Sequence, residues 1–456
     1  MGPRTNDPTT DEIRTGTGGR AIAFVALLAM AATVVIGLLG LILHPLIIAL
    51  SSVGVVVLVA GAIVLVTTPG GRRFAGGIAA AAGAVAWIWI LVDGDAFLFT
   101  LAIALGTALS TVLALLALRP RPYRPAPQHA PTPSRPFLLL NPRSGGGKVE
   151  KFELDAKARA MGADVSYLEE GTDAETELRK AVKGGADLLG AAGGDGTQAL
   201  VAQIAVEHDL PIVCIPAGTR NHFALDLGLD RKDPRRALDA LGDEGEEILI
   251  DLGWAEDRAF VNNVSLGAYA EIIARPEYRD AKFTTAMTVL PDVTEPSARS
   301  GFIVEADGQP PVEDPQLVQV ANNPYAGPRD PAPAGTRPRL DTGTLGIDVV
   351  AYTNPTELGD LVAQALAGRT IRSKAYRSWT GQRIKITSRD GVVRAGVDGE
   401  AREFPSPLEI SIAPATLRVR VPKDRPGPKV GWARVDRRIV ARLWAILLGR
   451  GDPERT

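Results

Sequence analysis

The sequence predicts an α-helical membrane region followed by an α/β domain that is built on a parallel β-sheet. Four long apolar segments fill the first quarter of the 456-residue chain. From about residue 136 onward, short apolar strands alternate with amphipathic helical stretches, which is typical of a parallel sheet with helices on its faces. A chain of this length has room for two or three domains.

The overall composition argues against two classes of protein. The net charge of −2 gives no whole-chain signal for binding nucleic acid, so we expect no such partner. Cys214 is the only cysteine, which rules out an internal disulfide framework. It lies in an apolar strand, where we expect a buried thiol rather than a nucleophile.

Each of the four apolar segments has about 19 to 23 residues, enough to cross the hydrocarbon core of a bilayer. They are residues 21–43, 46–66, 74–92 and 96–118. A signal peptide would explain only the first segment. None contains Asp, Glu, Lys or Arg, which favours an anchor over a transport pathway. The small residues at 76–83 permit close helix packing, within one bundle or between copies in a homo-oligomer.

Arginines in the connecting segments predict the orientation of these helices. They lie before the first segment, between the second and third, and after the fourth: Arg4, Arg14, Arg20, Arg72, Arg73, Arg119, Arg121, Arg124 and Arg135. The loops at 44–45 and 93–95 contain no lysine or arginine. By the positive-inside rule, the N-terminal tail (1–20) and the long C-terminal part are cytoplasmic, in a multi-pass protein of the cell (plasma) membrane.

The segment 119–135 is rich in proline and arginine, a composition typical of an extended, semi-rigid linker. Its arginines are candidates for contacts with anionic lipid head groups, each worth about 1 kcal/mol near the surface. We therefore expect this linker to keep the next domain close to the bilayer.

In the next part of the chain, predicted strands and helices alternate as they do in a parallel sheet with helices on its faces. Strands are predicted at 137–140, 163–167, 186–191 and 211–215, with helices at 151–161, 174–182 and 197–204. In such sheets, ligands bind beyond the carboxyl ends of the strands.

Glycine-rich segments follow three of these strands. They read Asn141-Pro142-Arg143-Ser144-Gly145-Gly146-Gly147-Lys148, Gly193-Gly194-Asp195-Gly196-Thr197 and Pro216-Ala217-Gly218-Thr219-Arg220-Asn221. Glycine lets the backbone approach an anion, and the free N–H groups at a helix start point at it. Three such ends together favour a phosphate-binding cleft over unrelated turns. Because Asp195 cannot bind phosphate unaided, we predict that it holds a Mg²⁺ that bridges to phosphate oxygens.

The loop around Asp195 also has two other interpretations. Asp-Gly is a common turn dipeptide that often has no chemical role. The pattern Gly194-x-Gly196-x-x-Ala199 satisfies a dinucleotide-binding fingerprint as well. That fingerprint needs an acid at the end of the next strand, and the residues there, 216–219, include none. The dinucleotide interpretation is weaker for that reason.

Taken together, these segments resemble a known family. The motifs Asn141-Pro142-x-Ser144-Gly145, Gly193-Gly194-Asp195-Gly196-Thr197 and Pro216-x-Gly218-Thr219-x-Asn221-x-Phe223-Ala224 are similar, in order and spacing, to those of the diacylglycerol kinase catalytic domain. That family also holds sphingosine, ceramide and bacterial lipid kinases. The resemblance covers about residues 137–421. It implies an NAD-kinase-like α/β domain that binds ATP (136–253), followed by a β-rich, β-sandwich domain for the lipid substrate (254–425).

The resemblance also implies roles for individual residues. Those expected at the nucleotide are Asn141, Ser144, Gly145, Lys148, Gly193, Gly194, Gly196, Thr197, Thr219 and Asn221, with Asp195 near the ATP-bound Mg²⁺. Val397-Asp398-Gly399-Glu400-Ala401 resembles the family's Asp-Gly-Glu turn, so Glu400 is the expected general base and, with Asp195, the expected catalytic pair. Without the upstream motifs, 398–400 would be interpreted as a hairpin turn between 391–394 and 408–412.

Two parts of the sequence depart from the family pattern or leave it open. Leu340-Asp341-Thr342-Gly343-Thr344 stands where many bacterial members have Leu-Asp-Asp-Gly at a structural Mg²⁺ site. Thr342 removes a charged ligand, which puts that metal in doubt, while the turn is expected to persist. The polar set Asn262, Asn263, Ser265 and Gly267 falls where the family lines its cleft, and it would equally suit the cap of a turn.

The C-terminal part, 426–456, predicts a basic amphipathic helix, because Trp432, Leu443 and Trp444 lie at helical spacing among arginines. Such a helix suits the membrane interface, and it would equally suit docking against the enzyme. The function expected from all these features is a membrane-anchored, ATP- and Mg²⁺-dependent lipid kinase that converts diacylglycerol to phosphatidic acid. The alternatives are an NAD-kinase-like kinase of a soluble substrate and a nucleotide-binding membrane sensor without kinase activity.

Overall fold

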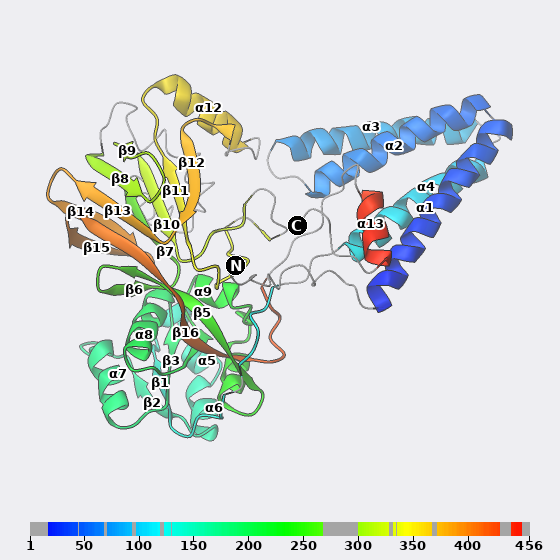
Figure 1. Cartoon of the computed structure of the whole chain (residues 1–456). Coiled ribbons are helices and arrows are strands. Elements are labelled where there is room, and N and C mark those ends of the chain that lie inside the picture. The colour runs from blue at the N-terminus through cyan, green and yellow to red at the C-terminus, as the bar shows by residue number, and fades with distance from the viewer. Residues whose placement is uncertain are drawn as a thin grey trace, which may run out of the picture. The chain divides into compact units, whose positions relative to one another are not determined.

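The chain divides into two units (Figure 1). The computed structural model describes residues 17–43, 45–67, 71–93, 97–118, 123–128, 130–267, 300–327, 332–333, 335–366, 372–428 and 439–448. The helical unit comprises Met1–Arg121, Leu366–Gly368 and Val430–Thr456, and the sheet unit comprises Pro122–Ala365 and Arg369–Lys429. The sheet unit is therefore inserted, along the chain, between the first four helices and the last one.

The helical unit contains the four helices expected from the apolar segments. They are α1 (Thr17–Leu43), α2 (Pro45–Thr67), α3 (Arg72–Asp93) and α4 (Phe97–Ala117). Among the described residues, one helical stretch, Gly18–Gly40, is long and apolar enough to cross a membrane, whereas the apolar stretches Ser52–Val66 and Leu101–Ala117 are shorter. Many large apolar side chains on these helices are exposed, such as Ile42 at 77% and Leu98 at 75%.

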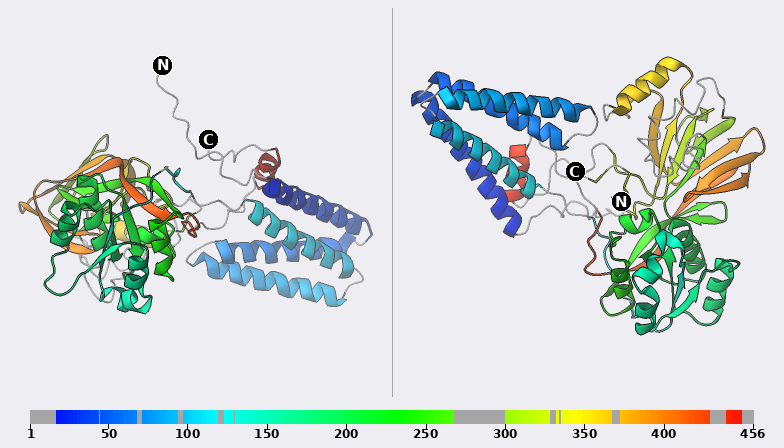
Figure 2. Two further views of the ribbon diagram at one scale, coloured as in Figure 1. Left: turned by 90° about the horizontal axis from the view of Figure 1, so that it is seen from below. Right: turned by 180° about the vertical axis from the view of Figure 1, so that it is seen from behind.

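Small residues bring α2 and α3 into close contact. A Cβ added to Gly61 would lie 2.4 Å from the backbone nitrogen of Ala80, and one added to Gly83 would lie 2.4 Å from that of Leu58. The small residues at 76–83 thus pack within the unit. The helices α1 and α4 form the other close pair, and Figure 2 shows both pairs from two further sides.

The C-terminal helix α13 (Ile439–Leu447) packs on α1 and α4. Its Leu443 and Ile446 are fully buried in a cluster with Ala23, Ala26 and Ala117, whereas Trp444 is 51% exposed. One face of the predicted amphipathic helix is therefore docked against protein. The predicted positions 429–438 and 449–456, including Trp432, lie outside the described residues.

The sheet unit begins with the predicted parallel strands. They are β1 (Pro136–Leu140), β2 (Asp164–Tyr167), β3 (Leu188–Gly193) and β4 (Ile212–Pro216), in the order β2-β1-β3-β4. All three pairings among them are parallel. These strands read as apolar runs because helices cover both faces of the sheet.

Alternate residues of each strand pack on opposite helical layers. Leu139 and Cys214 face a core shared with α7 (Ala174–Lys183) and α8 (Asp195–Glu207). The other face packs on helices at 148–160 and 234–241. Cys214 is buried as predicted, and burial raises the pKa of its thiol.

The remaining helices of this layer are short. They are α5 (Lys148–Lys151), α6 (Leu154–Ala160), α9 (His222–Asp226) and the 3-10 segments η2 (Ser144–Gly146) and η3 (Pro234–Leu241). The single helix predicted at 151–161 is wrong in its bounds, because Glu153 adopts a φ of 49° and separates α5 from α6.

A long strand, β16 (Leu408–Pro422), carries this sheet into the second half of the unit. It pairs in parallel with β4 near its carboxyl end and antiparallel with β13 (Arg383–Ser388) at its start. The same sheet includes β5 (Gly245–Ala255), β6 (Arg258–Phe260), β8 (Phe302–Ala306) and β9 (Val312–Glu313). Both β5 and β16 therefore belong to the parallel sheet and to the β-rich half.

The second sheet has six strands, all paired antiparallel. Their order is β12 (Tyr376–Gly381), β11 (Leu345–Val350), β10 (Leu317–Ala321), β7 (Asn263–Gly267), β14 (Val392–Val397) and β15 (Glu400–Pro405). One buried apolar core holds residues of this sheet, such as Val264, together with residues of the first, such as Ile386. The β-sandwich expected after the α/β part is thus present, and the described residues of this half also include the helix α12 (Pro355–Leu366).

The described residues of the linker, 123–128 and 130–135, are fastened to the sheet unit. Gln128 forms a β-bridge with Glu247, and the Arg124 guanidinium donates to the carbonyl of Arg425 at 2.7 Å. Arg124 is therefore engaged by protein, while the predicted lipid-facing Arg119 and Arg121 lie outside the described residues.

Candidate functional site

The three glycine-rich strand ends meet at one edge of the parallel sheet. The Gly218 N–H donates to the Gly193 carbonyl at 2.9 Å. A Cβ on Gly218 would lie 2.5 Å from the Gly194 Cα, and one on Gly145 would lie 2.1 Å from the Ala217 oxygen. Glycine is needed here because backbones from different loops touch. The structure thus brings together the segments that we expected to form one cleft.

Lys148 connects the first of these segments to the third. Its Nζ lies 3.3 Å from the Gly218 carbonyl oxygen and 3.5 Å from that of Pro216. Partial burial, together with the charge of Arg231, lowers the pKa of its ammonium group. Asn141 and Ser144 lie just before it, where the Asn141 N–H donates to the Ala192 carbonyl at 2.9 Å and ties the loop to β3.

The N-terminus of α8 has the features of an anion site. Gly194 is the N-cap, and no side chain caps this helix end. A Cβ added to Gly194 would meet no atom within 4 Å, whereas the neighbouring Gly193 is packed against the Thr197 side chain at 3.0 Å. The first N–H groups of a helix have no partner within the helix. An uncapped helix start beside open space fits a phosphate group.

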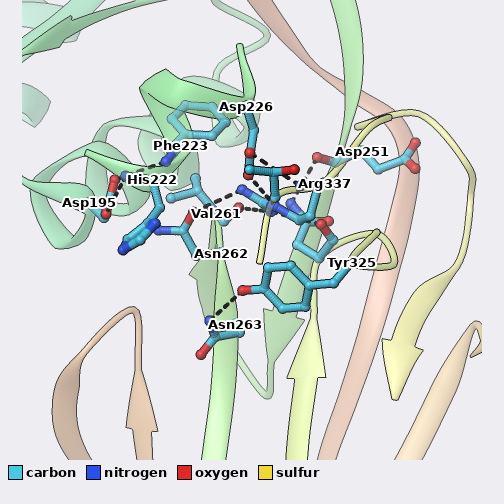
Figure 3. Close-up of polar contacts among 12 residues, drawn as sticks. Asp195, His222, Phe223, Asp226, Asp251, Val261, Asn262, Asn263, Tyr325 and Arg337 are labelled. Atoms are coloured by element: carbon cyan, nitrogen blue, oxygen red, sulfur yellow. Dashed lines mark hydrogen bonds and ion pairs between the residues drawn. The ribbon is translucent and has the colours of Figure 1, made fainter. Parts of the chain in front are cut away.

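Asp195 is the first residue of α8, and both of its carboxylate oxygens accept backbone N–H groups of α9 (Figure 3). The donors are His222 at 3.0 Å and Phe223 at 3.2 Å. The sequence did not predict this contact. Each carboxylate oxygen has a second lone pair, and Mg²⁺ in proteins takes one or two carboxylates together with phosphate oxygens and water. The predicted metal role of Asp195 fits this geometry and stays a prediction.

Two predicted nucleotide-binding residues of the third segment have different environments. Thr219 is exposed at the loop tip. Asn221 is buried with a φ of 49°, and its Nδ2 donates to the Gly218 carbonyl at 2.7 Å. Asn221 therefore shapes the turn in this structure, and Thr219 is the member of the pair that is open to a ligand.

Glu400 lies against the start of α8. It is the first residue of β15, after a turn made by Asp398 and Gly399. A Cβ on Gly196 would lie 2.4 Å from Glu400 Oε1. The other oxygen, Oε2, accepts from Arg402 at 2.8 Å. The segment is a β-hairpin, with β15 rather than 408–412 as the second strand, and the hairpin brings the predicted base to the glycine loop.

Asp398 holds this hairpin in place. Its carboxylate accepts N–H groups from Val261 (2.8 Å), Asn262 (2.8 Å) and Asn263 (3.1 Å). Burial raises its pKa to about 7, the Asp195 charge acts in the same direction, and the three N–H donors oppose the rise. Asp398 thereby links the Glu400 turn to the chain between β6 and β7.

The polar residues after β6 have partners within the protein. Asn262 Oδ1 accepts from Arg337 at 2.8 Å, and Asn263 Nδ2 donates to the Tyr325 hydroxyl at 2.8 Å. Ser265 Oγ lies 3.4 Å from the Gly396 carbonyl oxygen, and Gly267 ends β7 with a φ of 70°. For Asn262 and Asn263, the structure thus favours a structural role over a free position in the cleft.

The turn expected at 340–344 is present, and Asp251 holds it, although the sequence analysis considered only Asp341 as an acid there. Asp251 accepts from the Gly343 N–H at 2.7 Å and from Asn323 Nδ2 at 2.6 Å. Thr342 Oγ1 also accepts from Asn323, and Asp341 pairs with Arg339 at 3.0 Å. In the described part of the chain, no three His, Cys, Asp or Glu side chains are grouped to hold a metal ion.

Sequence reasoning missed Arg337 and Asp226, which form a buried ion pair at 2.7 Å beside this site (Figure 3). Arg337 lies in a proline-rich stretch with other arginines nearby, and this composition gives no sequence signal of such a contact.

Comparison with known proteins agrees with this architecture. Residues 135–255 match the family described as "Diacylglycerol kinase catalytic domain", and residues 272–421 match the "YegS C-terminal NAD kinase beta sandwich-like domain". A solved structure of a candidate diacylglycerol kinase from Bacillus anthracis str. Sterne superposes with a TM-score of 0.51 at 19% identity, over 65% of this chain and 98% of that one. At this identity, the likeness shows the fold.

Curated relatives named "Diacylglycerol kinase" include proteins of two bacterial genera. The protein of Mycobacterium tuberculosis (strain CDC 1551 / Oshkosh) is 37% identical over 123 residues, which are 26% of this chain and 40% of that protein. The protein of Staphylococcus carnosus (strain TM300) is 28% identical over 280 residues, which are 58% of this chain and 88% of that protein. The two matched domains follow each other in the chain as the α/β part and the sandwich do, and with these relatives they show that the chain belongs to the diacylglycerol kinase family of lipid kinases.

Proposed function

We propose that this protein transfers the γ-phosphoryl group of ATP to a lipid hydroxyl, with diacylglycerol as substrate and phosphatidic acid as product. The observation that carries the proposal is the position of Glu400, whose carboxylate lies against Gly196 in the first turn of α8. An uncapped helix start for phosphate and a carboxylate for a proton are then neighbours. Phosphoryl transfer to an alcohol needs both.

The chain's own residues would divide the work as follows. The free N–H groups at the start of α8 and the Lys148 ammonium would hold the phosphates of ATP. Glu400 would accept the proton of the attacking hydroxyl at its carboxylate as the new P–O bond forms. Asp195 would hold Mg²⁺, which supplies charge neutralisation on the phosphates when bound.

The surface of the helical unit is an argument for a lipid substrate. Its four helices carry many exposed, large apolar side chains, which is expected of helices that face lipid. A lipid acceptor never leaves the bilayer, so anchoring the enzyme there raises the local concentration of substrate. We propose that all four helices cross the plasma membrane and that the sheet unit lies in the cytoplasm, where ATP is.

The test is phosphate transfer from labelled ATP by the purified full-length protein in mixed micelles. Acceptors would be diacylglycerol, monoacylglycerol, a sphingoid base, ceramide, a polyprenol and NAD. We expect labelled phosphatidic acid and dependence on Mg²⁺. Labelled NADP with no labelled lipid would support the soluble-substrate alternative. ATP binding without transfer to any acceptor would favour a sensor.

A further inference from the structure

The guanidinium of Arg337 is fully buried and joins several parts of the sheet unit. Its side chain is 0% exposed. Nε donates to Asp226 Oδ2 at 2.7 Å, Nη1 to the carbonyls of Val261 and Asn322, and Nη2 to Asn262 Oδ1 at 2.8 Å. The five N–H groups of arginine form a rigid planar fork. The partners of this one fork therefore cannot move independently.

One arm of the fork leads to Asp195. Asp226 is the last residue of α9, and the first residues of that five-residue helix, His222 and Phe223, donate their N–H groups to the Asp195 carboxylate (Figure 3). Both ends of α9 are thus held by charged groups, Asp195 at the start and the Asp226–Arg337 pair at the end. A shift of Asp226 would move the donors that orient Asp195.

The other arm leads to Glu400. Arg337 holds the Val261 carbonyl and the Asn262 side chain, and the N–H groups of the same two residues donate to Asp398. Asp398 begins the turn that ends at Glu400. The chain between β6 and β7 is therefore hydrogen-bonded both to Arg337 and to the hairpin that carries Glu400.

We propose that Arg337 is a positioning residue that keeps Asp195 and Glu400 in register across the site. It touches neither carboxylate and acts through α9 on one side and through residues 261–263 on the other. This inference rests on the proposed function, because it concerns the two residues assigned there to the metal and to the proton. Removing the fork leaves Asp226 buried without its partner, and burial already raises the pKa of that carboxyl, so α9 is expected to shift.

The test compares Arg337→Met with Arg420→Met in the full-length protein. Arg420 is an equally buried arginine of the same unit, and its guanidinium donates to the carbonyls of Ala240, Gly242 and Pro131, away from the site. Both substitutions remove a buried fork of the same size. Steady-state kinetics with diacylglycerol would be measured well below the unfolding temperature of the less stable variant. Hydrogen exchange of the backbone amides would be measured alongside.

We expect Arg337→Met to lower kcat by about 100-fold, the scale of a misplacement near 1 Å, with a smaller change in the KM for ATP. Arg420→Met should keep the parent kcat. Exchange should quicken at His222, Phe223 and residues 261–263 in Arg337→Met and not in Arg420→Met. Arg337→Lys keeps the charge with fewer fixed donors and should recover part of the lost kcat.

Equal kcat in Arg337→Met and the parent, with lower unfolding temperature alone, would reduce Arg337 to a structural tie and overturn the inference. If Arg337→Met does not fold, Asn262→Leu removes one bond of the fork, and it should lower kcat about tenfold. Parent kcat in Asn262→Leu would then overturn the inference. A parent protein without lipid phosphorylation contradicts the proposed function instead, and the exchange comparison still reports whether Arg337 couples α9 to residues 261–263.

Discussion

Three carboxylates around the first turn of α8 differ in their partners, and these partners determine what each can do. Asp195 accepts two N–H groups of α9, and Asp398 accepts three from residues 261–263. Among the described residues, Glu400 pairs with Arg402 alone, and its side chain is 52% exposed. Of the three, Glu400 is the one that an incoming hydroxyl can reach most directly.

Glu400→Gln should lower kcat by about 10²–10⁴-fold, because the amide cannot accept the proton of the attacking hydroxyl. The unfolding temperature should stay near that of the parent, since the side chain is half exposed. Glu403→Gln is a matched control on the same strand, because Glu403 is likewise exposed and pairs with Arg394. Labelled-ATP transfer by both variants checks this, and equal rates would remove Glu400 from the mechanism.

Asp195→Asn should remove most turnover while the fold survives. The amide oxygen can still accept an N–H of α9, but the negative charge for Mg²⁺ is gone. The fall in kcat should be accompanied by a higher Mg²⁺ concentration at half-maximal rate. A variant with the parent Mg²⁺ dependence and parent rate would show that the metal is held elsewhere.

Asp398 should make stability depend on pH. Its pKa is about 7 in the folded protein and about 3.9 in an unfolded chain, so the folded state holds the proton over this interval. Its contribution to the free energy of unfolding is therefore full below about pH 4 and falls as pH rises to about 7, by at most about 1.4 kcal/mol per pH unit. Urea unfolding from pH 4 to 8 should show this slope in the parent and a shallower one in Asp398→Asn. Equal slopes would mean that the three N–H donors keep the carboxylate ionised.

At the scale of elements, the loops at the strand ends are packed so closely that glycines serve two different purposes. Gly218 is needed for contact, because its Cβ would lie 2.5 Å from the Gly194 Cα. Gly194 faces open space and has an extended backbone that any residue can adopt. One glycine of the pair thus maintains the fold, and the other leaves room for a ligand.

Gly218→Ala should consequently affect stability, whereas Gly194→Ala should affect the binding of ATP. Gly218→Ala should lower the free energy of unfolding by about 1–3 kcal/mol, as expected of overpacking. Gly194→Ala should leave stability nearly unchanged and raise the KM for ATP about tenfold, equivalent to about 1.4 kcal/mol of binding. Thermal unfolding and initial rates separate the two effects. An unchanged KM in Gly194→Ala would argue against phosphate at this helix start.

The elements that sequence reasoning found are those whose signal is local. The parallel strands follow from short apolar runs, and the meeting of their ends follows from the geometry of a parallel sheet. The break between α5 and α6 was missed because a positive φ at Glu153 has no sequence signature comparable to glycine. The Arg337–Asp226 pair joins residues 111 apart, and no periodicity connects them. Asp195 and Glu400 were thus named from motifs, and their roles stay predictions, whereas the contacts around them required the folded chain.

At the scale of the whole molecule, the sheet unit is inserted into the helical unit along the chain. The polypeptide leaves the helical unit after α4 and returns to it in α13, whose Leu443 and Ile446 pack against α1 and α4. Both ends of the sheet unit are therefore connected to the same helical unit.

The proposed membrane arrangement can be tested by chemical labelling, because Cys214 is the only cysteine and is buried. The parent should therefore react weakly with a membrane-impermeant maleimide. In intact cells, His44→Cys and Gly94→Cys should be labelled, since the loops without arginine are expected outside. Gly71→Cys, next to Arg72, should be labelled only after permeabilisation. Equal labelling of all three before permeabilisation would contradict four crossings, and labelling of Gly71→Cys alone would reverse the orientation and place the site on the side of the membrane that lacks ATP.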